Sequence, residues 1–214
     1  MLSQTVCDCV IATNQTYVEA LKKQGKFDKE AQKEAFKLTY NAVMAALECG
    51  YRHIDTAAAY ENEESVGKAI NDFLRKTGIN RSELFITTKL WNDNHGYEST
   101  KKAIDESLNK LGLDYVDLYL IHWPNPIKFR DCWAQKNAES WKAMEEAYSE
   151  GKLKAIGISN FYERHIEELI KTAKVIPMVN QIKICPGQSQ QDISEYCRKM
   201  GMIVEGYSPL GTGG

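Results

Sequence analysis

The sequence has no long apolar run. Hydrophobic residues make up 43% of its 214 residues, but they occur in runs of only a handful. A helix that spans a membrane needs about 20 predominantly apolar residues in a row, so none is predicted. The first residues, Met-Leu-Ser-Gln-Thr-Val-Cys, also lack the basic start and the apolar stretch of a secretory signal peptide. We therefore expect a cytoplasmic protein without a membrane partner.

The sequence also has no excess of basic residues over acidic ones. The 27 Lys and Arg residues stand against 29 Asp and Glu residues, which gives a formal net charge of −2. Proteins that bind nucleic acid through its phosphates usually present a basic patch or tract, and the sequence has no such tract. We expect no nucleic-acid partner.

Cysteine is present but lacks the spacing of a metal site. The six cysteines are thinly spread, and the two nearest neighbours, Cys7 and Cys9, are separated by one residue only. A structural zinc site usually needs paired motifs such as Cys-x-x-Cys, and none occurs here. We predict no metal site and, in a chain without a secretion signal, reduced thiols.

From residue 40 onward, short β-branched or aromatic runs alternate with amphipathic stretches. The runs predict six strands: Arg52–Thr56, Leu84–Lys89, Val116–His122, Leu153–Ile158, Met178–Ile184 and Met202–Tyr207. The stretches, with apolar positions three and four apart, predict five helices: Glu64–Arg75, Ser99–Leu111, Ala138–Glu150, Arg164–Ala173 and Gln191–Met200. Strands that alternate with helices indicate a parallel sheet.

Two parallel architectures compete, a doubly wound open sheet and an eight-stranded barrel. No Gly-x-Gly-x-x-Gly follows any expected strand, so the fingerprint of the dinucleotide-binding open sheet is missing. Polar residues instead end all six expected strands: Asp55, Lys89, His122, Ser159 with Asn160, Gln181, and Tyr207 with Ser208. At one strand end such a residue would mean little, but six in series favour a (β/α)8 TIM barrel, whose active site lies at this rim.

The sequence is too short for the whole barrel. A TIM barrel usually takes about 250 residues, and only 14 residues follow Met200. Val6–Thr13 could be a short first strand, whereas Tyr17–Gln24 and Phe27–Ala46 look mainly helical. We predict an incomplete α/β barrel with about six recognisable βα strands, an uncertain first strand and no last βα unit. Its parts would be a mainly helical segment, residues 1–38, and a partial barrel domain, residues 39–214.

Four residues of the strand ends and loops form a chemical set: Asp55, Tyr60, Lys89 and His122. A phenol has an unperturbed pKa near 10, which is too high for an efficient proton donor at neutral pH. A nearby ammonium lowers the pKa of a phenol, and a carboxylate can hold that ammonium in place. An imidazole can orient and polarise a carbonyl oxygen. Each residue alone could be structural, but the set suits protonation of an oxygen while hydride reaches carbon.

Several segments resemble the aldo-keto reductase family, in the order that the family has them. They are Gly50–Ala57, Tyr60–Gly67, Ile86–Asn92, Asp114–Pro124, Ala155–Phe161, Met178–Gln181 and Gly206–Gly211. The resemblance runs from about Thr39 to the last residue and is closest to the microbial and protozoan branch with diketogluconate and methylglyoxal reductases. It implies a TIM-barrel oxidoreductase that reduces a small aldehyde or ketone with NADPH.

The resemblance also implies roles for individual residues. Tyr60 would be the general acid, Lys89 and Asp55 would lower its pKa, and His122 would orient the substrate carbonyl. The expected cofactor-binding residues are Asp55, Ser159, Asn160, Gln181, Tyr207, Ser208, Leu210 and Thr212. Trp91 and Trp123 would line an apolar substrate pocket, or else pack as ordinary core aromatics.

Two departures from the family pattern leave alternatives open. Residues 1–38 do not match the family's first hairpin and strand, and its last strand with a Lys-Ser…Arg cluster for the adenosine 2′-phosphate is not found. The choice of NADPH over NADH therefore rests on family habit. The chain could also be a catalytically silent binding or regulatory module, or an incomplete part of a longer reductase. Open sheet edges would favour self-association.

Overall fold

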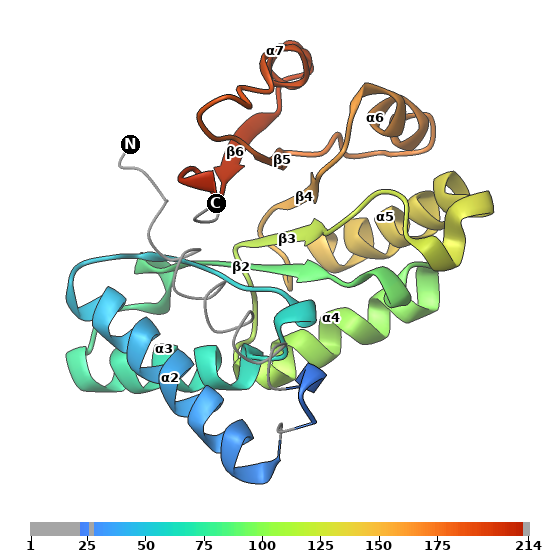
Figure 1. Cartoon of the computed structure of the whole chain (residues 1–214). Coiled ribbons are helices and arrows are strands. Elements are labelled where there is room, and N and C mark those ends of the chain that lie inside the picture. The colour runs from blue at the N-terminus through green and yellow to red at the C-terminus, as the bar shows by residue number, and fades with distance from the viewer. Residues whose placement is uncertain (1–21, 26–27, 212–214) are drawn as a thin grey trace.

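The computed structural model describes residues 22–25 and 28–211, and its centre is a curled six-stranded sheet (Figure 1). All paired strands are parallel, and they follow one another in chain order from β1 to β6. Their bounds are β1 His53–Asp55, β2 Phe85–Leu90, β3 Leu118–Ile121, β4 Ile156–Ser159, β5 Val179–Lys183 and β6 Ile203–Tyr207. This order is that of an incomplete (β/α)8 barrel, which confirms the predicted fold class.

Helices follow the strands and cover the convex face of the sheet (Figure 1). The α-helices are α2 Lys29–Glu48, α3 Glu63–Thr77, α4 Tyr97–Leu111, α5 Trp133–Ser149, α6 Glu163–Ile170 and α7 Gln191–Lys199. Short 3₁₀ turns lie at η1 Ala58–Tyr60, η2 Arg81–Glu83, η3 Asn92–Asn94 and η4 Ile127–Cys132. None of the helices within residues 22–25 and 28–211 is both long and apolar enough to cross a membrane.

Local sequence signals explain where several helices begin and end. Asp28 caps α2, because its carboxylate accepts hydrogen bonds from the backbone N–H groups of Glu30 and Ala31. Gly78 and Gly112 end α3 and α4 in the left-handed conformation, with φ of 73° and 63°. α2 runs without a break through residues 38 and 39, the predicted domain boundary. The expected strand Val6–Thr13 lies outside the described residues.

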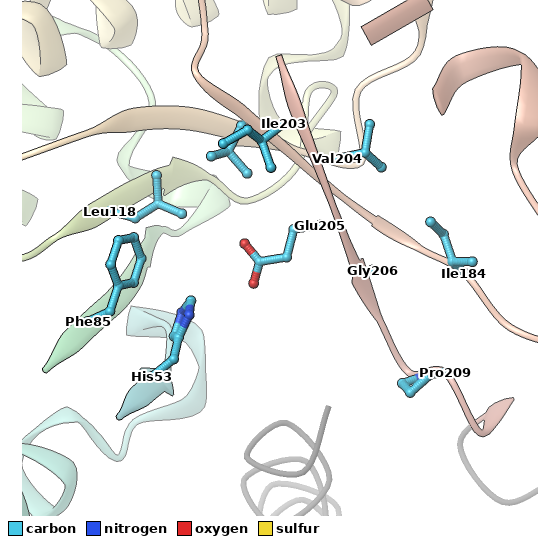
Figure 2. A pocket seen from close by; sticks show the side chains of 10 residues that line it. His53, Phe85, Leu118, Ile184, Ile203, Val204, Glu205, Gly206 and Pro209 are labelled. Atoms are coloured by element: carbon cyan, nitrogen blue, oxygen red, sulfur yellow. The ribbon is translucent and has the colours of Figure 1, made fainter. Parts of the chain in front are cut away.

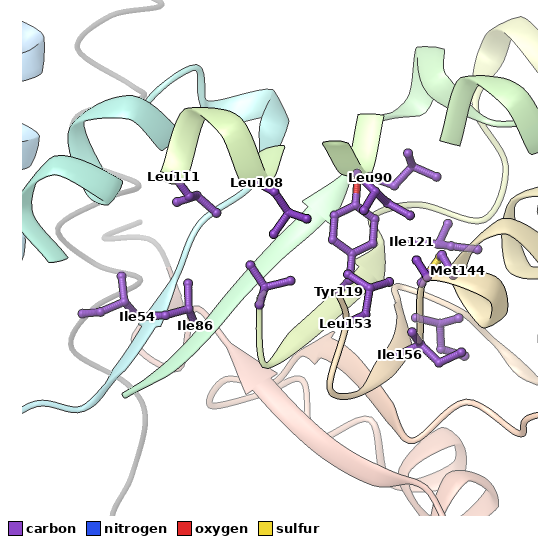
Figure 3. Close-up of a cluster of buried hydrophobic side chains, with 14 of the residues drawn as sticks. Ile54, Ile86, Leu90, Leu108, Leu111, Tyr119, Ile121, Met144, Leu153 and Ile156 are labelled. Atoms are coloured by element: carbon purple, nitrogen blue, oxygen red, sulfur yellow. The ribbon is translucent and has the colours of Figure 1, made fainter. Parts of the chain in front are cut away.

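The main core lies between the sheet and the helices (Figure 3). It contains fully buried side chains of the strands, such as Ile54, Ile86 and Ile121, and of the helices, such as Leu111 and Met144. Helices α3 and α4 pack so closely that a Cβ at Gly67 would stand 2.2 Å from the Leu111 carbonyl oxygen. The convex side of the sheet is therefore closed and tightly packed.

The concave side of the sheet holds a groove, which we call the inner groove (Figure 2). Its volume is about 460 Å³. Residues from β1, β2, β3, β5 and β6 line it, together with neighbouring loop residues: His53, Phe85, Leu118, Val179, Ile184, Ile203, Val204, Glu205, Gly206 and Pro209. Within the described residues, β1 and β6 each pair with one neighbour only, so the sheet does not close on itself.

The six strands and five helices predicted from residue 40 onward all occur, with shifted ends. α5 begins at Trp133, five residues before the predicted Ala138, and α6 ends at Ile170 rather than Ala173. The third strand is shorter than predicted, because Val116 makes only an isolated bridge to Leu153. These differences lie at element ends, where local propensity is weakest.

Candidate active site

The carboxyl ends of the first two strands bring Asp55 and Lys89 together. The Lys89 Nζ atom donates to Asp55 Oδ1, and it also donates to the Thr56 carbonyl oxygen at 3.1 Å. The side chains of Lys89 and Asp55 are only 2% and 6% exposed. Burial without a partner would be costly for either charge, so each residue fixes the other in place.

Tyr60 and His122 lie beside this ion pair. Tyr60 ends the 3₁₀ turn after β1, and the Lys89 Nζ atom stands 5.3 Å from the centre of its ring. His122 directly follows β3, and its ring meets the ring of Tyr60 edge to face, with 5.9 Å between centroids. Three strand ends thus assemble the four residues that the sequence predicted as a catalytic set.

Burial keeps His122 neutral. It lowers the pKa of His122 to about 3, and the charge of Lys89 adds to this effect. A neutral imidazole carries one N–H donor and one acceptor nitrogen. Within the described part of the chain, His122 Nδ1 is buried without a hydrogen-bond partner. At neutral pH the ring can therefore serve as a hydrogen-bonding group but not as a cation.

The predicted cofactor-binding residues of the next strands form a hydrogen-bonded group. Asn160 follows β4 with a φ of 63°, and its Nδ2 donates to the His122 carbonyl oxygen at 3.0 Å. Its Oδ1 accepts the hydroxyl of Tyr207 at 2.8 Å. Ser159 Oγ donates to the Gln181 carbonyl oxygen at 2.9 Å, and Gln181 Nε2 donates to Asp55 Oδ2 at 2.8 Å. This group is thus continuous with the Asp55–Lys89 pair.

The last predicted cofactor-binding residues are less enclosed. Burial raises the pKa of Tyr207 to about 12, so its half-buried phenol remains neutral. Ser208 is half-buried and has a φ of 50°. Leu210 is 81% exposed, and its apolar side chain takes no part in the hydrogen-bonded group, while Thr212 lies outside the described residues.

Two tryptophans surround His122. The ring centroid of Trp91 lies 5.4 Å from that of His122, and the ring of Trp123 lies nearly parallel to the His122 ring at 6.3 Å. Trp91 is half-buried and Trp123 is 42% exposed, so neither is an ordinary core residue. Trp123 also lines a smaller cavity of about 290 Å³ at this rim.

Sequence reasoning missed several residues that support the site. Glu63 is 2% exposed and accepts the hydroxyl of Thr88 at 2.7 Å, directly before Lys89. Glu205 of β6 accepts a hydrogen bond from Gln181 Nε2 at 3.2 Å. A charged residue inside a predicted strand, between Val204 and Gly206, was the signal that could have identified Glu205.

The other three histidines, His53, His95 and His165, lie outside the set of four. His95 and His165 are buried, and burial lowers the pKa of each to about 4. His53, Asp55 and Glu205 form one group whose potential ligand atoms lie within 4.8 Å of one another. Asp55 already accepts hydrogen bonds from Lys89 and Gln181. Among the described cysteines, Cys49, Cys132, Cys185 and Cys197 are free.

Comparison with known proteins agrees with this geometry. The model of the aldo/keto reductase family matches residues 21–214. The chain belongs to the aldo/keto reductase family. The matched range begins before residue 39, where the sequence motifs first become recognisable, and so includes helix α2.

Individual relatives are similar over most of this chain. Glyoxal reductase of Bacillus subtilis is 48% identical over 80% of this chain and 58% of its own length. The 9,11-endoperoxide prostaglandin H2 reductase of Trypanosoma cruzi is 47% identical over 82% of this chain and 58% of its own length. This aldo/keto reductase chain thus spans about three fifths of the length of the curated relatives it matches.

Solved structures show the same relation. An aldo-keto reductase from a Medee basin deep-sea metagenome library has a TM-score of 0.75 at 47% identity, covering 82% of this chain and 60% of its own. The Bombyx mori aldo-keto reductase in complex with NADP has a TM-score of 0.73 at 42% identity, covering 79% of this chain and 56% of its own. Both likenesses support the incomplete-barrel description.

Proposed function

We propose that this chain reduces aldehydes or ketones to alcohols with NADPH, with Tyr60 as the general acid. The observation that carries the proposal is the buried Lys89–Asp55 ion pair, with the ring of Tyr60 beside the ammonium and His122 at its edge. Four residues from three strand ends supply a proton donor, a cation, a carboxylate and a neutral imidazole. Such a set suits the conversion of a carbonyl to a hydroxyl group.

The charges around Tyr60 explain why its hydroxyl would be the proton donor. During reduction the carbonyl oxygen gains negative charge, and the Tyr60 hydroxyl would donate its proton to that oxygen. A neighbouring ammonium stabilises the phenolate that remains. Lys89 is suited to this because Asp55 and the Thr56 carbonyl oxygen hold its Nζ in place. Asp55 would act through Lys89 rather than on the substrate.

His122 would orient the carbonyl before the proton moves. Its pKa of about 3 makes it neutral at physiological pH, so it can offer an N–H without introducing a competing acid. Trp91 and Trp123 flank the ring and provide the apolar surface against which a small carbonyl compound can lie.

The residues of the rim fit a nicotinamide cofactor. Ser159, Asn160 and Gln181 offer hydroxyl and amide groups, which can pair with a carboxamide, and Tyr207 offers a neutral aromatic ring for stacking. When bound, NADPH would supply the hydride. The choice of NADPH is supported by the family and by the Bombyx mori relative that was solved with NADP.

A comparison of variants tests this function. NADPH oxidation at 340 nm would be followed with glyoxal, the compound in the name of one relative, for the wild-type chain, Tyr60→Phe and Tyr51→Phe. Tyr51 is a matched control because it is half-buried like Tyr60 but lies before β1, at the end of that strand away from the rim. We expect Tyr60→Phe to lose at least about 100-fold in rate, the usual contribution of a general acid, and Tyr51→Phe to stay within two-fold. Equal rates for Tyr60→Phe and wild type would contradict the proposed role.

A catalytically silent binding module is the second candidate. The chain covers about three fifths of its relatives' length, and β1 and β6 each have one strand partner within the described residues. A folded sample that neither oxidises NADPH nor shows a rise in melting temperature with NADPH would favour this candidate. A sample that melts higher with NADPH but does not turn over would indicate binding without catalysis.

We also propose that the protein acts in the cytoplasm. The four described cysteines are free thiols, which suits a reducing compartment. Fractionation of cells that produce the tagged protein would test this, and recovery in a secreted or membrane fraction would contradict it.

A further inference from the structure

One side-chain amide lies between two carboxylates inside the sheet. Gln181 Nε2 donates to Asp55 Oδ2 at 2.8 Å and to Glu205 Oε1 at 3.2 Å. The three residues come from β5, β1 and β6, so the contact joins the two edge strands of the sheet. Figure 2 shows the Glu205 carboxylate pointing into the inner groove, toward His53.

The two carboxylates dictate how the Gln181 amide is turned. A carboxylate only accepts hydrogen bonds, whereas an amide has an NH₂ donor on one side and an oxygen acceptor on the other. If the amide were flipped, its oxygen would face two negatively charged acceptors, which is unfavourable. With the amide as it stands, both N–H bonds are used. Within the described part of the chain, Gln181 Oε1 then accepts no hydrogen bond.

Asp55 alone would hold this orientation less firmly. It is already the partner of Lys89, and it supplies one acceptor to the Gln181 NH₂ group. Glu205 supplies the second. Among the described residues, the charged and titratable groups around Glu205 are Asp55 and His53 of β1 within 4.8 Å and, beyond Asp55, Lys89 of β2. Glu205 and Asp55 thus share the NH₂ group of Gln181 between them.

We propose that Glu205 is a positioning residue, which turns the Gln181 amide so that Oε1 is presented as the acceptor for the nicotinamide carboxamide. The effect on cofactor binding rests on the proposed function, but the orientation of the Gln181 amide does not depend on the cofactor. It assigns a role to the one carboxylate of β6 and explains why a charged side chain lies on the inner side of this strand.

The orientation can be measured directly by NMR of the Gln181 side-chain amide in the chain without cofactor. We expect Glu205→Ala to shift one of the two Gln181 Nε2 proton resonances upfield and to speed its exchange with water, because that proton loses its acceptor. Glu205→Gln keeps an acceptor oxygen and should restore most of the shift. Gln181 resonances that are unchanged in Glu205→Ala would overturn the proposal.

The consequence for the cofactor is measured by NADPH fluorescence titration. We expect Glu205→Ala to raise the Kd for NADPH about five-fold, the value of one net hydrogen bond, with Glu205→Gln within two-fold of wild type. A general loss of structure would also weaken NADPH binding, so Glu205→Ala is also introduced into a chain that already carries Gln181→Ala. There Glu205→Ala should have no further effect, whereas an undiminished five-fold loss would contradict action through Gln181.

Glu195→Ala is the matched control. Glu195 of α7 also accepts a glutamine Nε2, from Gln191 at 2.9 Å, but it is exposed and lies on a helix that supplies none of the set of four. It should change neither the Gln181 resonances nor the Kd. If the wild-type chain binds no NADPH, the proposed function fails, while the NMR comparison still decides whether Glu205 orients Gln181.

Discussion

The rim of polar strand ends and the inner groove belong to the same sheet, but their side chains differ in burial and in hydrogen bonding. At the rim, Asp55, Lys89 and Gln181 are all buried, and hydrogen bonds join them. In the inner groove, Phe85 is 40% exposed and Ile203 is 67% exposed. At the rim, buried charged and polar side chains are held by hydrogen bonds, whereas the groove leaves apolar side chains exposed in the described structure.

This difference shows that the fold can hold the four predicted site residues in place without burying every apolar side chain of the sheet. The set of four comes from β1 to β3 and the loops that follow them, and residues after β4 and in β5 add hydrogen bonds to His122 and Asp55. The groove keeps Phe85 and Ile203 exposed in the part of the chain that the structure describes. Substitutions at the rim should therefore lower the free energy of unfolding strongly, and substitutions in the groove should change it little.

The largest effect is expected for Lys89→Met. It removes the cation but leaves Asp55 buried, and breaking a buried ion pair in this way costs about 3–5 kcal/mol of unfolding free energy. Lys183→Met, at the end of β5, is the control because Lys183 is half-buried and no ion pair with it is found among the described residues. Urea unfolding measures both. Similar losses in the two variants would contradict the special role of the rim pair.

Gly67→Ala should cost somewhat less. The new Cβ would stand 2.2 Å from the Leu111 carbonyl oxygen, so α3 and α4 must move apart, at a cost of about 2–3 kcal/mol. Gly206→Ala adds the same methyl group at the open edge, where the nearest side-chain atom is 3.5 Å away. Thermal unfolding should show a clear drop for the first variant and little change for the second. A reversed order would refute the contrast between closed and open sides.

Acid should lower the free energy of unfolding because His122 is neutral in the fold. Its pKa is about 6.5 when unfolded and about 3 in the fold, so its contribution to stability is complete above pH 6.5 and is lost as the pH falls toward 3. At pH 5 the loss is about 2 kcal/mol. Unfolding free energies of wild type and His122→Asn between pH 7 and 5 test this, and the wild-type slope should be steeper. Parallel slopes would mean that His122 is not neutral in the fold.

The smallest effect on stability is expected for Ile203→Thr in the inner groove. Because this side chain is mostly exposed, the change should stay within about 0.5 kcal/mol. If the exposed edge of β6 favours self-association, the variant should lower the apparent mass measured by light scattering at high concentration. Unchanged association would exclude this residue as a contact between copies.

The sequence is sufficient to predict the strand ends, because each is preceded by a strongly β-branched or aromatic run. The amino-acid pattern alone therefore places Asp55, Lys89 and His122 at one rim. The contact between Asn160 and His122 is not predictable in this way, because it depends on the left-handed backbone of Asn160 and on a partner 38 residues away. Glu205 was missed for a similar reason, since its partner Gln181 is defined only by the pairing of β5 with β6.

The early start of α5 was missed because no local capping signal marks it. Cys132 and Trp133 lie before the periodic apolar pattern, and the indole N–H of Trp141, not a cap, makes the long-range hydrogen bond to Val175 that anchors the helix. Element ends of this kind are decided by tertiary contacts.

In the proposed reaction, NADPH bound at the rim would give a hydride to the carbonyl carbon, and Tyr60 would give a proton to the carbonyl oxygen. The most direct test is mass spectrometry of the product formed from glyoxal with NADPH deuterated at C4, once for each face. We predict an alcohol with one deuterium on carbon from one of the two deuterated cofactors, and no such product with Tyr60→Phe. A folded wild-type sample that yields no deuterated alcohol with either cofactor would contradict the account.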